Sequence, residues 1–133
     1  SAYVKRRNNL IFLSEDNNAI PAVELKYCFN ESIQNLTLFG VSCDYLFAVD
    51  GTLLFFEMMR IYDVFEAIIE KAFDTLTSLY LYAGRDDCGI TMTMRLSSSA
   101  DLSCLEIENL ALEAENDGEW QLSFCVQKSG DSL

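Results

Sequence analysis

The amino-acid sequence predicts a two-layer α+β sandwich in which helices pack on one face of a β-sheet. The main support is a change in hydrophobic periodicity along the chain. Apolar residues recur at helical spacing over 23–39 and 52–77, and with a period of two over 90–96 and 119–127. A segment rich in strand-forming residues, 41–49, lies between the two helical segments. Helices therefore come first and strands cluster late, which is typical of an α+β arrangement.

The first forty residues contain two helical segments separated by a polar break. Residues 2–13 are interpreted as the last turns of a helix that begins upstream, and residues 14–18 interrupt it. Pro21 is suited to the first turn of the next helix, because proline has no N–H to donate there. Gly40 follows helix 23–39 as a C-terminal cap.

The helical segment 52–77 organises the predicted core. At 100° per residue, one stripe of apolar side chains is wide enough to face a sheet; it consists of Leu54, Met58, Ile61, Phe65, Ile68, Ile69, Ala72 and Leu76. Glu66 and Glu70 lie one turn apart on the flank of this stripe. A carboxylate at the edge of a core either reaches water or lines a cleft, so these two residues are the first candidates for a functional site.

The second half of the chain is predicted to be mostly strand. In order, it contains strand 79–82, a loop over 85–89, strand 90–96, and one helical turn or a bend over 101–107. Strands 109–115 and 119–127 flank Asn116-Asp117-Gly118, a strong hairpin signal. One face of the last strand is expected to carry Trp120, Leu122, Phe124 and Val126.

Length and composition indicate one domain with a substantial core. The chain has 133 residues, and 50% of them are hydrophobic. Its apolar runs are short and interrupted by acids, so we expect no transmembrane span, and no signal peptide is visible. Because Ser1-Ala2 opens the chain without a methionine, we expect a piece of a longer protein. The cysteines form no Cys-x-x-Cys pair and are predicted to be buried, reduced thiols of a cytosolic protein: Cys28, Cys43, Cys88, Cys104 and Cys125.

Charge excludes several functions. The net charge is −12, from 21 acidic and 9 basic residues, so the basic footprint needed for nucleic-acid binding is missing. The one basic cluster, Lys5-Arg6-Arg7, is predicted to be the solvated face of a helix.

The chain contains no histidine. Histidine-based acid/base catalysis, histidine metal ligands and a phospho-accepting histidine within this chain are therefore excluded.

The order of these elements resembles the C-terminal part of bacterial sensor histidine kinases. The end of their dimerisation helix is similar to YVKRRNNLIFLSED, and the first helix of their GHKL (Bergerat-fold) ATPase domain is similar to AVELKYCFNESIQNLTLFGV. Their N-box helix and next strand match IYDVFEAIIEKAFDTLTSLYLYA, and their closing hairpin matches NLALEAENDGEWQLSFCV. The resemblance implies a Bergerat-like mixed sheet, the end of a dimerisation-type helix over 1–16, and a histidine-kinase-like ATPase domain over 17–133.

The resemblance also implies roles for acidic residues on the long helix. Kinases of this family carry E-x-x-x-N there: the glutamate orients water or substrate, and the asparagine holds the magnesium that bridges the ATP phosphates. Glu66 occupies the catalytic glutamate position, and Glu70 replaces the asparagine as the candidate magnesium ligand. Asp74 follows one turn later, and three acids in a row would repel a triphosphate. An acidic, solvated helix edge is therefore the competing interpretation.

The glycine motifs of the family are missing. Its D-x-G-x-G box should follow strand 90–96, where the aspartate contacts adenine and the glycines let the backbone approach the nucleotide. This chain has Ser-Ser-Ser-Ala-Asp over 97–101, so Asp101 is the candidate, displaced, adenine-binding residue. Few residues separate Asp101 from the hairpin, which leaves no room for the ATP lid or for the G-x-G phosphate cradle.

These observations predict a degenerate, inactive ATPase domain of a two-component signal transduction protein, acting by protein contacts and without a cofactor. One alternative is an active catalytic domain that binds ATP and magnesium, with Glu66 as general base, Glu70 as metal ligand and Asp101 at the adenine. Phosphotransfer would then need a histidine from outside this chain. The other alternative is a generic α+β interaction module.

The same interpretation carries expectations about partners and location. Protein partners in a signalling complex and a homodimeric parent protein are expected, with no nucleic acid and no membrane contact by these residues. The expected location is the cytoplasm, and this part of the chain could lie there as the cytosolic end of a membrane-bound sensor.

Overall fold

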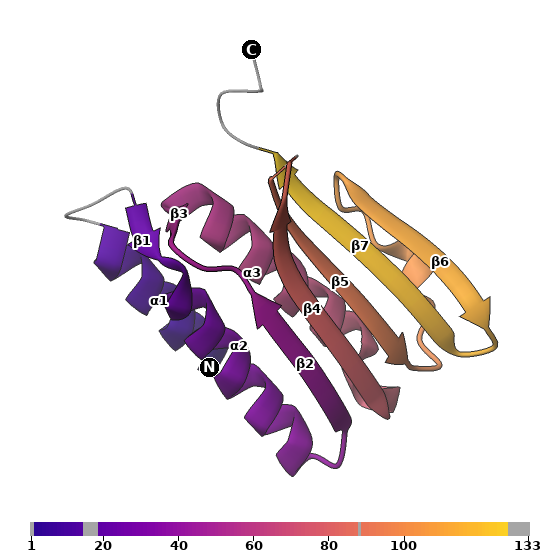
Figure 1. Ribbon diagram of the computed structural model, residues 1–133. Coiled ribbons are helices and arrows are strands. Elements are labelled where there is room, and N and C mark those ends of the chain that lie inside the picture. Colours follow the sequence, from indigo (N-terminus) through magenta and orange to yellow (C-terminus); the bar gives the residue numbers. More distant parts are fainter. Residues whose placement is uncertain (1, 15–18, 88, 128–133) are drawn as a thin grey trace.

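The computed structural model describes residues 2–14, 19–87 and 89–127, with side chains for all of these except 9–14 and 127. In this part of the chain, a layer of helices covers one face of a five-stranded sheet (Figure 1). The helices are α1 (Ala2–Ser14), α2 (Ala22–Leu38) and α3 (Phe55–Ala72). The predicted two-layer α+β sandwich is confirmed.

The five-stranded sheet is mixed, with strand order β2-β4-β5-β7-β6. The strands are β2 (Ser42–Ala48), β4 (Ser78–Asp86), β5 (Gly89–Ser97), β6 (Leu110–Asn116) and β7 (Glu119–Gln127). Strands β2 and β4 are parallel, and every other pair is antiparallel. Parallel neighbours need a crossover connection, and α3 provides it. The predicted hairpin is confirmed as β6–β7, with Asp117-Gly118 at its turn.

A second, two-stranded sheet joins the beginnings of α2 and α3. Strand β1 (Ala19–Pro21) pairs antiparallel with β3 (Thr52–Leu54), and Ile20 lies opposite Leu53 in the core. The sequence predicts neither strand, because an alternation of apolar and polar residues cannot be recognised within three residues. Pro21 therefore ends a strand, whereas the sequence placed it in the first helical turn.

The long helix is shorter than the predicted 52–77. It begins at Phe55 and gives way after Ala72 to a 3₁₀ turn, η1 (Phe73–Thr75). Leu54 was assigned to the buried stripe, which is wrong, because this residue lies on β3 and is exposed. The helix starts where the buried Glu57 side chain accepts a hydrogen bond from the Leu54 N–H at 3.0 Å. A glutamate three residues into a helix commonly caps it in this way.

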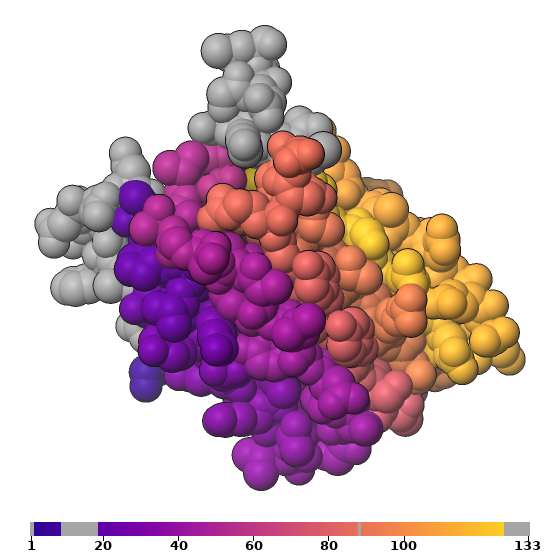
Figure 2. Space-filling view, viewed as in Figure 1, coloured from indigo at the N-terminus to yellow at the C-terminus, as the bar shows by residue number. Residues whose placement is uncertain are grey.

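The core lies between the helices and one face of the sheet. Helix α3 contributes Met58, Ile61, Tyr62, Phe65, Ile68 and Ala72, and the strands β5 and β7 contribute Ile90, Met92, Met94, Leu96, Leu122 and Phe124. The alternate residues of β5 (Thr91, Thr93 and Arg95) lie on the other face. Figure 2 shows that face, where the strands reach the surface with no helix over them.

Two further predictions concern membranes and thiols. Within the described residues, no helix combines the length and apolarity needed to span a bilayer. The described cysteines are free thiols, and burial raises the pKa of Cys28 to about 11. The prediction that the cysteines are buried holds for Cys28, whereas Cys43 and Cys125 are only partly buried and Cys104 is exposed on a 3₁₀ turn. Cys88 lies outside the described residues.

Gly40 ends α2 in a Schellman motif, and its replacement by alanine is expected to lower the free energy of unfolding by about 1–2 kcal/mol. Its φ is +91°, its N–H donates to Thr37 O, and the Val41 N–H donates to Leu36 O, both at 3.0 Å. A Cβ on Gly40 would contact nothing within 4 Å, so the cost is that of the backbone conformation alone. Urea unfolding measures it, with the exposed Gln34→Ala on the same helix as control. Equal stability of the two variants would contradict this assignment of the cap.

Candidate functional site

The three predicted site residues line two different pockets. The first, the α3 pocket, has a volume of about 510 Å³ and is lined by Tyr3, Glu66, Ile69, Glu70, Phe73 and Asp74. The second, the hairpin pocket, has a volume of about 540 Å³ and is lined by Thr75, Thr77, Ser97, Ser98, Ser99, Ala100, Asp101, Asp117, Gly118 and Trp120. The structure thus brings Glu66 and Glu70 together and leaves Asp101 in a separate pocket.

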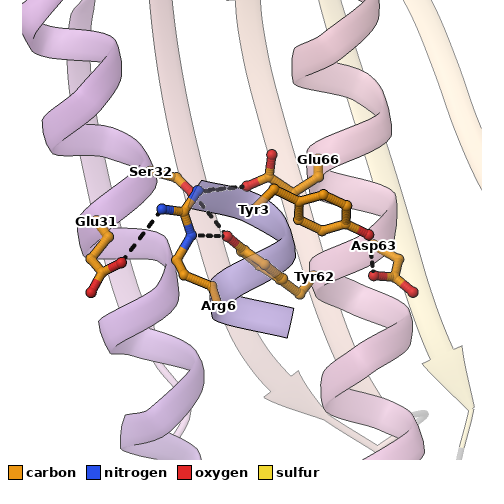
Figure 3. Close-up of polar contacts among 7 residues, drawn as sticks. All are labelled: Tyr3, Arg6, Glu31, Ser32, Tyr62, Asp63 and Glu66. Carbon is orange, nitrogen blue, oxygen red and sulfur yellow. Dashed lines mark hydrogen bonds and ion pairs between the residues drawn. The ribbon is translucent and has the colours of Figure 1, made fainter. Parts of the chain in front are cut away.

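Glu66 is part of a polar network between helices. Its Oε1 accepts a hydrogen bond from Ser32 Oγ at 2.9 Å and lies 3.5 Å from Nη2 of Arg6 (Figure 3). Ser32 belongs to α2 and Arg6 to α1, so this carboxylate contacts both neighbouring helices. Its side chain is 17% exposed. Oε1 of Glu66 therefore contacts side chains of α1 and α2 and links both helices to α3.

Arg6 is the centre of this network. Only 7% of the residue is exposed, so the prediction that Lys5-Arg6-Arg7 is a solvated helix face is wrong for Arg6. Its Nε donates to the hydroxyl of Tyr62, and its Nη1 lies 3.4 Å from Glu31 Oε2. Burial opposes its charge, but the Tyr62 hydrogen bond and the Glu66 carboxylate outweigh burial, so the pKa of Arg6 is raised. Burial also raises the pKa of Tyr62.

A second set of side-chain contacts, centred on Asp63, connects α1 to α3. Arg7 binds Asp63 through two hydrogen bonds, Nε to Oδ1 at 3.1 Å and Nη2 to Oδ2 at 3.3 Å. The Tyr3 hydroxyl donates to Asp63 Oδ1 at 2.7 Å. Burial, followed by this hydrogen bond, raises the pKa of Tyr3 to about 12. Tyr3, Arg6 and Arg7 are three and four residues apart, so helical spacing was the available signal that they share one face.

Glu70 and Asp74 continue the acidic row on α3 and η1. Both are exposed, and within the described part of the chain neither side chain forms an ion pair or a hydrogen bond. No group of three or more histidine, cysteine or acidic side chains in that part lies close enough together to hold a metal ion. Glu70 therefore reaches solvent at the α3 pocket, while Glu66 is largely covered.

Asp101 acts as a local cap. Its Oδ1 accepts hydrogen bonds from both N and Oγ of Ser103, at the start of the 3₁₀ turn η2 (Leu102–Cys104). The hydrogen bond from the Ser103 hydroxyl, followed by that from its backbone, lowers the pKa of Asp101. The hydroxyl of buried Ser98, between β5 and η2, donates to Ala72 O at 3.0 Å. The segment after β5 is thus fastened to the end of α3.

The comparisons with known proteins identify the fold. No family model matches the sequence, and no curated protein matches it significantly. The ATP-binding domain of PrrB from Mycobacterium tuberculosis has a similar structure, with a TM-score of 0.53. The match covers 82% of this chain and 95% of that domain, at 9% sequence identity. The fold is that of a histidine-kinase ATP-binding domain.

A second solved structure similar to this chain is that of the histidine kinase AdeS from Acinetobacter baumannii, with a TM-score of 0.47 and 7% sequence identity. The match covers 92% of this chain and 75% of that chain. The resemblance seen in the sequence is confirmed at the level of the fold. At 9% identity to the PrrB domain, the likeness concerns the backbone arrangement and not individual side chains. The roles of Glu66, Glu70 and Asp101 remain predictions.

Proposed function

We propose that this chain is a degenerate histidine-kinase-like ATPase domain that no longer binds nucleotide and acts through contacts with proteins of a two-component signalling complex. The observation that carries this proposal is the environment of Glu66. In an active domain the equivalent glutamate would face water or substrate. In this chain its Oε1 is bound by Arg6 and Ser32 and links α1 and α2 to α3.

The residues present do not fit ATP and magnesium. Glu70 can offer a carboxylate to magnesium, but Asp101, the candidate adenine contact, lines a different pocket. The segment over 97–101 contains no glycine that would let its backbone lie close to a nucleotide. Asp74 adds a further negative charge beside Glu70, which opposes a triphosphate. We therefore derive no catalytic step for this site.

The proposal includes the organisation of the chain. We propose that the sequence divides into the end of a dimerisation-type helix over 1–16, of which the structure describes 2–14, and an ATPase-like body over 17–133, of which it describes 19–87 and 89–127. The sequence of this body contains neither the lid nor the glycine boxes. In this proposal the parent protein is a homodimer, and this part of it lies in the cytoplasm. A position at the cytosolic end of a membrane-bound sensor is one such location. The packing of α1 on α3 through Tyr3, Arg6 and Arg7 supports a fixed connection between the two parts.

Calorimetric titration with a non-hydrolysable ATP analogue and magnesium tests the loss of nucleotide binding. We expect no saturable heat at micromolar to millimolar nucleotide, because the sequence contains no G-x-G phosphate cradle and the α3 pocket is acidic. The ATP-binding domain of PrrB, titrated in the same way, is the positive control. Saturable binding in the micromolar range would overturn the proposal.

An active domain with an atypical site is the second candidate, because Glu66 and Glu70 share one pocket. If this candidate is correct, nucleotide at a hundredfold excess over its dissociation constant should stabilise the folded protein by about 2.7 kcal/mol. The stabilisation should appear as a rise in melting temperature that is lost in Glu70→Ala and kept in Glu113→Ala, an exposed glutamate on β6. If no rise occurs, this candidate fails.

A further inference from the structure

We infer that the α3 pocket, together with the exposed ring of Phe39 beside it, packs against the preceding turns of the helix to which α1 belongs in the parent protein. The occupant of this surface is a segment of the same protein, located before Ser1 in sequence. The inference rests on one part of the proposed function, the assignment of residues 1–16 to the end of a longer helix. It adds the surface on which that helix packs and the residue types that face this surface.

Helices α2 and α3 lie side by side up to their ends and run in the same direction. Ser32 Oγ of α2 donates to Glu66 Oε1 of α3 at 2.9 Å. About two helical turns further along each segment (32 to 39 and 66 to 73), the rings of Phe39 and Phe73 pack edge to face with centroids 5.4 Å apart. At about 1.5 Å per residue, the two segments therefore stay in contact for roughly 10 Å beyond Ser32 and Glu66.

Helix α1 lies over the first part of this surface. Arg6 reaches between the other two helices, with its Nη1 3.4 Å from Glu31 of α2 and its Nη2 3.5 Å from Glu66 of α3 (Figure 3). Arg7 binds Asp63, about one turn earlier on α3. Residue numbers thus fall along α1 as they rise along α3, so the two helices run antiparallel. Helical turns that precede α1 would therefore run toward the ends of α2 and α3.

Helical periodicity indicates which upstream residues face this surface. Side chains seven residues apart lie on nearly the same face of a helix, because seven residues make about two turns. Arg7 binds Asp63, so the residue seven positions before Arg7 should face Glu70. By the same step, the residue seven positions before Arg6 should face Phe73.

The charges along α3 predict a basic residue in the preceding turns. Asp63 and Glu66 are each paired with an arginine of α1. Glu70 and Asp74 continue the same row at the next turns, and their side chains form no ion pair within the described residues. A lysine or arginine seven positions before Arg7 would extend the pairing between the two helices by about two turns.

The exposed apolar side chains at the helix ends predict an apolar residue next to that base. Leu38 is 84% exposed, Phe39 is 74% exposed and Phe73 is 38% exposed. Neighbouring apolar side chains with this exposure are typical of a surface that another element covers. An apolar residue seven positions before Arg6 would pack on the rings of Phe39 and Phe73.

Thermal unfolding of two lengths of the protein tests the inference. The shorter is this chain, and the longer carries about fourteen more of the parent protein's own residues before Ser1, roughly four helical turns. Phe39→Ser should lower the melting temperature of the longer chain by about 3–5 °C and hardly change that of the shorter chain, where the ring is exposed. Glu70→Gln/Asp74→Gln should likewise lower the melting temperature in the longer chain only.

Matched controls separate packing of the added turns from general effects of the substitutions. Tyr27→Ser replaces another exposed ring of α2, and Glu113→Gln/Glu115→Gln removes the same charge from β6. Both controls should have the same effect in the two lengths.

Three results would each overturn the inference. The first is an equal effect of Phe39→Ser in both lengths, and the second is an acidic residue of the parent at either predicted position. The third is light scattering that shows Phe39 joining two copies of this chain. The nucleotide titration, repeated on the longer chain, tests the proposed function separately, because none of these three results depends on nucleotide binding.

Discussion

Replacing Phe29 with alanine is expected to lower the free energy of unfolding by about 3–5 kcal/mol, because a large aromatic ring is removed from the core. Phe29 of α2 is fully buried, and its ring lies 5.0 Å from that of Phe65, 6.1 Å from Tyr62 and 6.3 Å from Phe47 between centroids. These partners belong to α3 and β2. The truncation therefore opens a cavity where the two helices and the parallel edge strand of the sheet meet.

Urea unfolding measures this loss as a shift of the midpoint at constant slope. Because a domain is stable by only about 5–15 kcal/mol, the variant should lose a large share of its stability. Phe56→Ala is the matched control: the chemistry is the same, but this side chain is 44% exposed. The control should change stability by less than about 1 kcal/mol. Similar losses in the two variants would contradict the assignment of Phe29 to the core.

Elements with strong local signals were predicted well. The apolar residues of α2 recur at helical spacing up to Phe39, and the helix ends at Leu38, two residues before Gly40. The last hairpin was predicted from Asn116-Asp117-Gly118, and Asp117-Gly118 form its turn. In both cases the information lies within a few residues of the element, so neighbours in sequence decide the structure.

Features that depend on distant contacts were not predictable in the same way. Strands β1 and β3 are stabilised by each other across the whole of α2 and β2, and each alone is only three residues long. Arg6 was predicted to be solvated because a single helix does not show what packs against it. The contact between Arg6 and Glu66 joins residues sixty positions apart in the chain, so no local pattern shows it.

Replacing Arg6 with alanine is expected to lower the free energy of unfolding by about 2–3 kcal/mol, at the low end for a broken buried ion pair because Glu31 stays exposed. The substitution removes donors from Tyr62 and Glu66 and leaves the Glu66 carboxylate partly buried without a counter-charge. Thermal unfolding followed by circular dichroism measures the change. Lys5→Ala, an exposed neighbour on α1, is the control and should have little effect.

A double-mutant cycle decides whether the network itself causes the loss. In a Glu66→Gln background the uncompensated charge is gone, so Arg6→Ala should cost about 1 kcal/mol less than in the original chain. Arg6→Lys should recover only part of the stability, since one ammonium group cannot reproduce the fork that serves Tyr62, Glu31 and Glu66. If the two substitutions are simply additive, Glu66 is not held by Arg6. The carboxylate would then be free to face a nucleotide, and the proposal of an inactive domain would lose its main support.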